Sequence, residues 1–180
     1  MKSLDTITAG ASFAALVAGC ASAQIGMNPV VPENLRVPAT QTLSVVAQAT
    51  GVQIYECAAG KTDPTRFEWA LKAPEAQLVD SAGKSIGKHY AGPTWESNDG
   101  SKAVGEVKAR DDGPDANAIP WLLLSAKSTV GNGIFGKTQS VQRLNTVGGK
   151  APADGCSQAQ IGTEARIPYR ATYYFYVARS

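Results

Sequence analysis

The sequence contains no concentration of charge of one sign and no long hydrophobic run. Its 17 basic and 15 acidic residues are interspersed and give a formal net charge of +2. Because no run of lysine or arginine could follow a phosphate backbone, we expect no nucleic-acid partner. The apolar stretch at residues 9–18 is too short to cross a bilayer, so we expect no transmembrane span.

Histidine and cysteine are both scarce. His89 is the only histidine, and the three cysteines, Cys20, Cys57 and Cys156, show no CxxC spacing. Without that spacing, and without a histidine near Cys57 or Cys156 in the sequence, a catalytic or metal-binding thiol pair is not expected.

The N-terminal segment is typical of an export signal. Lys2 precedes the apolar residues 9–18, and residues 21–23, Ala-Ser-Ala, form the small-x-small pattern that a signal peptidase accepts. This pattern predicts a signal at residues 1–23. Residues 17–20, Val-Ala-Gly-Cys, also fit the box before a lipid-modified cysteine, in which case the signal is residues 1–19 and acyl chains on Cys20 anchor the protein to a membrane. Either cleavage predicts export, to the periplasm or the cell exterior or as a membrane-anchored lipoprotein.

Export would determine the oxidation state of the two cysteines that remain in the mature protein. If Cys20 is discarded with the signal or capped by lipid, Cys57 and Cys156 remain in a compartment where thiols are oxidised. We therefore predict a Cys57–Cys156 disulfide.

The rest of the chain predicts a single all-β domain. Prolines in residues 24–39 predict an extended lead-in that packs along the surface, followed by one domain at residues 40–180. The apolar run 119–126 predicts a strand buried on both faces, residues 147–165 a long loop, and residues 169–179 a closing strand. Period-two alternation predicts further strands at 43–47, 53–57, 67–71, 77–80, 85–90, 94–97 and 102–108. Roughly eight to ten strands without a long helix predict an antiparallel β-barrel or a β-sandwich with long loops.

One motif suggests a cofactor that its context does not support. Residues 131–136, GNGIFG, match the GxGxxG of dinucleotide-binding folds. A phosphate-binding loop of this kind needs a following helix within a repeated βαβ array, whereas a strand-like segment follows here. We interpret the motif as a glycine-rich connection between strands.

Several landmarks occur in a characteristic order: VQIYEC, GKHYAGPTWESNDGS, AIPWLLL, VQRLNTVGG, GC and YRATYYFY. With these landmarks the chain resembles the domain of unknown function 3455 family, which is found in bacteria and fungi and often carries an export signal. The resemblance covers nearly the whole chain from about Gln41 onward. It implies a single exported domain and brings no catalytic residues with it.

The segment GKHYAGPTWESNDGS contains the first candidate site. An imidazole with two carboxylates is a common ligand set for a divalent metal, so His89, Glu96 and Asp99 are candidate metal ligands. His89 and Glu96 would lie opposite each other if residues 85–91 and 94–97 are successive strands. Asp99 belongs to the next turn, where capping of backbone amides also explains it. A hydrogen-bonded structural role is the alternative for His89.

The aromatic residues suggest a second kind of site, an aromatic-lined cleft for a ligand. Trp95 lies in a turn-rich segment close to His89. Arg143 lies in a strand otherwise made of Val141, Leu144 and small polar residues, where it would present a cation to an anionic ligand or pair with Glu96 or Asp99. His89, Trp95, Glu96 and Arg143 are therefore ligand-binding candidates. We expect a ligand-binding or structural domain of the cell envelope whose partner is a small molecule or an envelope component. The alternative is a small hydrolase centred on His89, either metal-dependent or acid–base; no catalytic residue is singled out, and a divalent metal is the only cofactor suggested.

Overall fold

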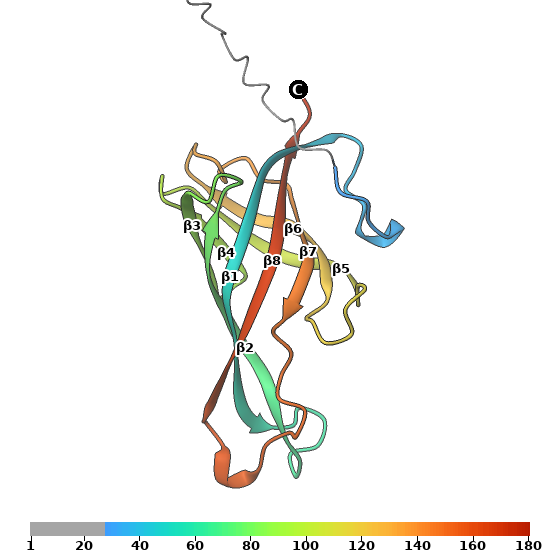
Figure 1. Ribbon diagram of the computed structural model, residues 1–180, viewed down its shortest axis with the longest axis vertical. Helices are drawn as coiled ribbons and strands as arrows, with labels where there is room; N and C mark the ends of the chain where they lie inside the picture. Colours follow the sequence, from blue (N-terminus) through green and yellow to red (C-terminus); the bar gives the residue numbers. More distant parts are fainter. Residues whose placement is uncertain (1–27) are drawn as a thin grey trace, which may run out of the picture.

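A computed structural model describes residues 28–180, which form one antiparallel sheet closed into a barrel (Figure 1). Each strand pairs with the next along the chain, and β8 pairs with β1 to close the ring. The strands are β1 (Gln41–Ala59), β2 (Phe67–Val79), β3 (Ser85–Tyr90), β4 (Thr94–Ser97), β5 (Lys102–Asp111), β6 (Trp121–Val130), β7 (Ser140–Gly148) and β8 (Glu164–Ala178). The predicted all-β fold is confirmed, and of the two predicted architectures the chain adopts the barrel.

The only helical segments in residues 28–180 are two short 3₁₀ turns, η1 (Glu33–Leu35) and η2 (Gln158–Gln160). None of the helices in this part of the chain has the length and apolar character needed to cross a membrane. The predicted export signal and Cys20 lie outside the described residues.

Two pairs of predicted strands are in fact single long strands. Residues 43–47 and 53–57 both belong to β1, and residues 67–71 and 77–80 both belong to β2. Gly51, in the middle of β1, marks a close approach to β2 and not a turn, since a Cβ atom there would lie 2.0 Å from the Glu75 carbonyl oxygen. The strand therefore continues through the glycine.

The closing strand has the predicted alternation. Tyr169, Ala171, Tyr173 and Phe175 are buried inside the barrel. Tyr176, on the outer face, is also buried because the lead-in covers it: its hydroxyl donates to the Gln142 side chain, which in turn donates to the Leu35 carbonyl at 2.6 Å.

The lead-in also explains the apolar run in β6. Leu35 in η1 is fully buried, and η1 contacts β5 and β6 from outside the barrel. One face of β6 therefore points into the barrel, where Leu124 is buried, and the other meets the lead-in. The side chains of Trp121, Leu122 and Leu123 are only half-buried, less than the continuous apolar run predicts.

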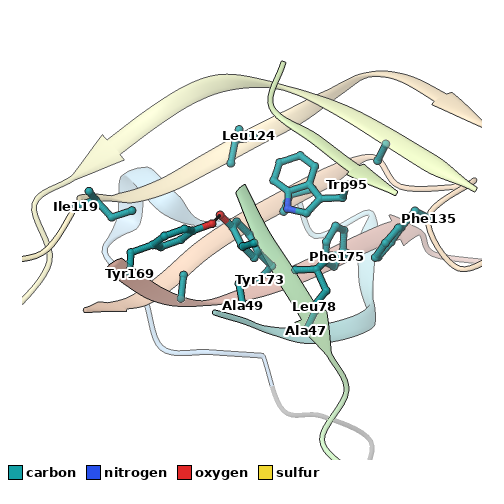
Figure 2. Close-up of a cluster of buried hydrophobic side chains, with 14 residues drawn as sticks. Ala47, Ala49, Leu78, Trp95, Ile119, Leu124, Phe135, Tyr169, Tyr173 and Phe175 are labelled. Carbon is teal, nitrogen blue, oxygen red and sulfur yellow. Dashed lines mark hydrogen bonds between the residues drawn. The ribbon is translucent and has the colours of Figure 1, made fainter. Parts of the chain in front are cut away.

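The segment GNGIFG at residues 131–136 is a connection between β6 and β7, and no helix follows it. Phe135 from this connection is fully buried and packs against Phe175, with ring centroids 4.4 Å apart (Figure 2). Asp99 Oδ2 accepts the Ile134 amide at 3.0 Å, and Ser101 Oγ accepts the Phe135 amide at 3.1 Å. The connection therefore fills one end of the barrel with an aromatic side chain.

The long strands β1, β2 and β8 extend beyond the shorter strands at the other end (Figure 1). There the predicted disulfide is confirmed: Cys57 in β1 is bonded to Cys156 in the β7–β8 loop. Trp69 Nε1 donates to the Gly155 carbonyl in the same loop at 2.6 Å. This loop corresponds to the long loop predicted near residues 147–165, and both bonds hold it against the extension.

Candidate functional site

The barrel wall has a window because the β3–β4 hairpin is short. The pairing of β2 with β3 ends at Ala76 and His89, and the hairpin turns at residues 91–93. Beyond the turn no strand formed by residues 28–180 separates β2 from β5. Leu71 on β2 and Val107 on β5, which are 58% and 50% exposed, lie beside this opening.

Behind the window lies a cavity of about 270 Å³. This is close to the lower end of the volumes typical of ligand pockets, roughly 300–1,000 Å³. Most of its lining is apolar or aromatic, and among the lining residues there is no aspartate or glutamate. The lining comprises Gln53, Leu71, Lys72, Ala73, Pro74, His89, Gly92, Pro93, Trp95, Val107, Leu122, Leu124, Arg143 and Tyr173.

The position of His89 is set by the β3–β4 hairpin. Its side chain points into the barrel, is 3% exposed and stacks on Trp95 with ring centroids 4.7 Å apart and planes 11° from parallel. The Nδ1 atom lies 2.8 Å from the Thr94 carbonyl oxygen. Since a carbonyl can only accept, Nδ1 carries the proton and Nε2 keeps a free lone pair. His89 thus offers the cavity a hydrogen-bond acceptor.

Burial keeps this imidazole neutral. The pKa of His89 is lowered to about 3, mainly by loss of hydration; the Thr94 carbonyl acts to raise the pKa, and the nearby Arg143 charge acts to lower it. At neutral pH the ring is therefore an uncharged group between two aromatic neighbours, Trp95 and Tyr173.

Arg143 is the cation inside the barrel. Its Nε and Nη2 atoms donate to the Pro120 carbonyl at 3.1 and 2.9 Å. Among the described residues it forms no ion pair: Glu96 pairs with Lys88 and Lys102 instead, and Asp99 binds the turn around it. The pairing predicted as an alternative for Arg143 is therefore not formed. An arginine has five N–H donors; two bind the Pro120 carbonyl, and the guanidinium also lies within hydrogen-bonding reach of the Tyr173 hydroxyl, so the remaining donors have no carbonyl or carboxylate partner in the described residues.

The positive charge of Arg143 reaches several buried phenols. Burial raises the pKa of Tyr55, Tyr169 and Tyr173, and the Arg143 charge lowers it in each case. The hydroxyls of Tyr169 and Tyr173 point toward each other, 3.5 Å apart (Figure 2). The phenols stay protonated and neutral, so none of them compensates the arginine.

Two further donors in the cavity wall have no partner in the described part of the chain. Gln53 and Trp95 are each 1% exposed, yet Gln53 Nε2 and Trp95 Nε1 make no hydrogen bond there. A buried donor left without an acceptor costs about 1–3 kcal/mol. Both atoms have almost no solvent-accessible surface of their own, so they belong to the packed wall and do not face the open part of the cavity.

The structure separates the predicted metal ligands. Trp95, and not Glu96, lies opposite His89, and Glu96 is paired with Lys88 on the outer face. Glu96 accepts a hydrogen bond from the Tyr90 hydroxyl at 2.7 Å. Asp99 caps the β4–β5 turn through the Ser101 amide and hydroxyl, as its turn interpretation predicts. No group of three potential metal-ligating side chains is found in residues 28–180.

One segment of the sequence matches the nucleophile motif of hydrolases but does not form the strand-to-helix turn that this motif requires. Residues 83–87, GKSIG, match the GxSxG of hydrolase nucleophile elbows, which join a strand to a helix. Here they form part of a hairpin, and Ser85 is exposed at the start of β3. Its position is outside the cavity lining, so the pattern does not supply a nucleophile to His89.

Three of the four ligand-binding candidates, His89, Trp95 and Arg143, line one cavity, while Glu96 lies outside it. The sequence analysis missed Gln53, Leu122 and Leu124. Gln53 was detectable as the polar residue on the inward face of a strand whose inward neighbours are apolar. The inward aliphatic residues carried no signal that distinguishes a cavity wall from ordinary core.

Comparison with known proteins places the chain in one family. No curated protein and no solved structure shows significant similarity to it. The family model described as Protein of unknown function (DUF3455) matches residues 38–177, which include all strands of the barrel except the last residue of β8. The chain therefore belongs to this family, as the order of its sequence landmarks predicted.

Proposed function

We propose that the protein is an exported binding protein that holds a small organic molecule inside its barrel. The observation that carries the proposal is the cavity behind the β2–β5 window, whose walls are mostly apolar and include the neutral His89 imidazole and the Arg143 guanidinium. Ligand pockets commonly combine an apolar lining with a few such polar groups. The Cys57–Cys156 disulfide supports export, because structural disulfides persist in oxidising compartments.

The alternative, a hydrolase centred on His89, finds less support. No serine, threonine, cysteine or carboxylate side chain is among the residues that line the cavity. Of the other ionisable side chains there, burial raises the pKa of Tyr173, and Lys72 is paired with Glu56 and Glu164. The lowered pKa of His89 also keeps the ring from acting as an acid near neutral pH. A neutral imidazole with one free acceptor is better suited to hydrogen bonding a ligand.

Binding can be tested with benzyl alcohol as a neutral aromatic probe. We expect saturation-transfer NMR to show its contact with the protein, and native mass spectrometry of protein from its own cell envelope to show an organic adduct. Leu122→Trp places an indole in the cavity wall and should abolish the probe signal. Gln77→Trp adds the same group at an exposed outward position on β2 and should leave the signal unchanged. Equal binding by both variants would show that the probe does not occupy the cavity.

A further inference from the structure

The charges at the cavity are of one sign. Lys72 and Arg143 are its only charged lining residues. The Lys72 ammonium is already paired with Glu56 and Glu164 on the exposed extension. Arg143 has no carboxylate partner among the described residues and is only half-buried. Buried or partly buried charges in proteins are usually paired, so this guanidinium lacks the anion that such a position calls for.

We infer that the cavity takes a small organic acid whose carboxylate pairs with Arg143 while its apolar body lies among the aromatic and aliphatic walls. This inference rests on the proposed function and names its ligand class. Arginine is suited to the task because its planar donors match the two oxygens of a carboxylate.

The cavity also sets the size and shape of the apolar part. Its volume of about 270 Å³ is that of roughly nine water molecules at about 30 Å³ each, which corresponds to a ligand with on the order of ten non-hydrogen atoms. Trp95 and Tyr173 supply aromatic faces, and Leu122 and Leu124 supply an aliphatic wall. A single ring bearing one carboxylate satisfies both requirements, and the exposed side chains of Leu71 and Val107 leave an apolar entrance for it.

The probes for the test are benzoate, benzamide and benzyl alcohol, which share a ring and differ in charge. Using isothermal titration calorimetry on the disulfide-bonded protein at pH 7.5, we expect benzoate to bind at least about tenfold more tightly than either neutral compound, the difference that a charge-assisted hydrogen bond typically makes. This comparison needs no variant and so does not depend on the folding of a mutant.

Variants assign the preference to one side chain. Arg143→Gln should remove the tenfold preference for benzoate over benzyl alcohol, and Arg143→Lys should keep part of that preference. Arg170→Gln removes the same charge from the exposed outer face of β8 and should change neither affinity.

The outcomes distinguish the two proposals. Equal binding of the three probes, or a benzoate preference that survives Arg143→Gln, would overturn the organic-acid inference and leave the binding function standing. Failure of all three to bind would overturn the proposed function and the inference with it.

Discussion

Acidification should destabilise the barrel through one identified side chain. In the folded protein burial lowers the pKa of His89 to about 3, whereas an unfolded histidine has a pKa of about 6.5. Between these values the unfolded chain binds a proton that the folded barrel does not. Stability therefore rises with pH across this window and is lost as pH falls from about 6.5 toward 3.

The magnitude follows from the two pKa values. Between pH 7.5 and pH 5.0, protonation of His89 in the unfolded chain should lower the free energy of unfolding by about 2 kcal/mol, and the full loss below pH 3 would approach about 5 kcal/mol. Because the ring is 3% exposed, solvent screening discounts little of this energy.

Urea unfolding of the wild type and of His89→Gln at both pH values measures the effect. Carboxylates with a lowered pKa, such as Glu96 and Asp99, also respond to acid, but both proteins contain them and their contribution cancels in the difference. We expect the stability advantage of the wild type over the variant to shrink by about 2 kcal/mol at pH 5.0.

A direct readout is available because the chain has a single histidine. The imidazole Cε1–H resonance should not titrate between pH 7.5 and pH 5.0 in the folded protein. A titration midpoint near 6.5, or a wild-type advantage that is the same at both pH values, would refute the account of a buried neutral ring.

Three other perturbations test the fold. Replacing Cys57 and Cys156 by serine should lower the free energy of unfolding by up to about 4–5 kcal/mol, since the bond closes a loop of about 100 residues; equal thermal stability with and without reductant would contradict this. Gly105→Ala places a Cβ 2.8 Å from the Trp95 ring and should cost about 1–3 kcal/mol and perturb tryptophan fluorescence, so an unchanged urea midpoint would argue against the packing. Asp99→Asn should speed hydrogen exchange at the Ile134 and Phe135 amides but not at the Ala47 amide. Unchanged exchange rates at Ile134 and Phe135 would show that Asp99 and Ser101 do not hold the β6–β7 connection in place.

Much of the fold was predictable because apolar and polar residues alternate along a strand that has one face inside the barrel and the other outside. The closing strand at residues 169–179 follows from local alternation, and the disulfide follows from the number of cysteines left after export. Gly51 was misleading because glycine serves both as a turn residue and as a point of close approach, and only the position of Glu75 on the neighbouring strand decides between them.

The site was less predictable because it depends on register and closure. A shift of one residue in the β3–β4 pairing exchanges inward and outward side chains, so it decides whether His89 meets Glu96 or Trp95. Gln53 and Arg143 lie far apart in the sequence and reach one cavity only because the strands close into a ring. No local pattern carries that information.

The anchoring of the lead-in determines where the chain can be shortened. The family match begins at residue 38, yet the buried Leu35 and the hydrogen bond from Asn34 to the Arg110 carbonyl lie upstream of it. A recombinant fragment cut at the family boundary would deprive Gln142 of its acceptor and expose apolar surface on β6, which favours aggregation. The functional folding unit is therefore longer than the segment by which the family is defined, and expression should begin no later than about residue 28.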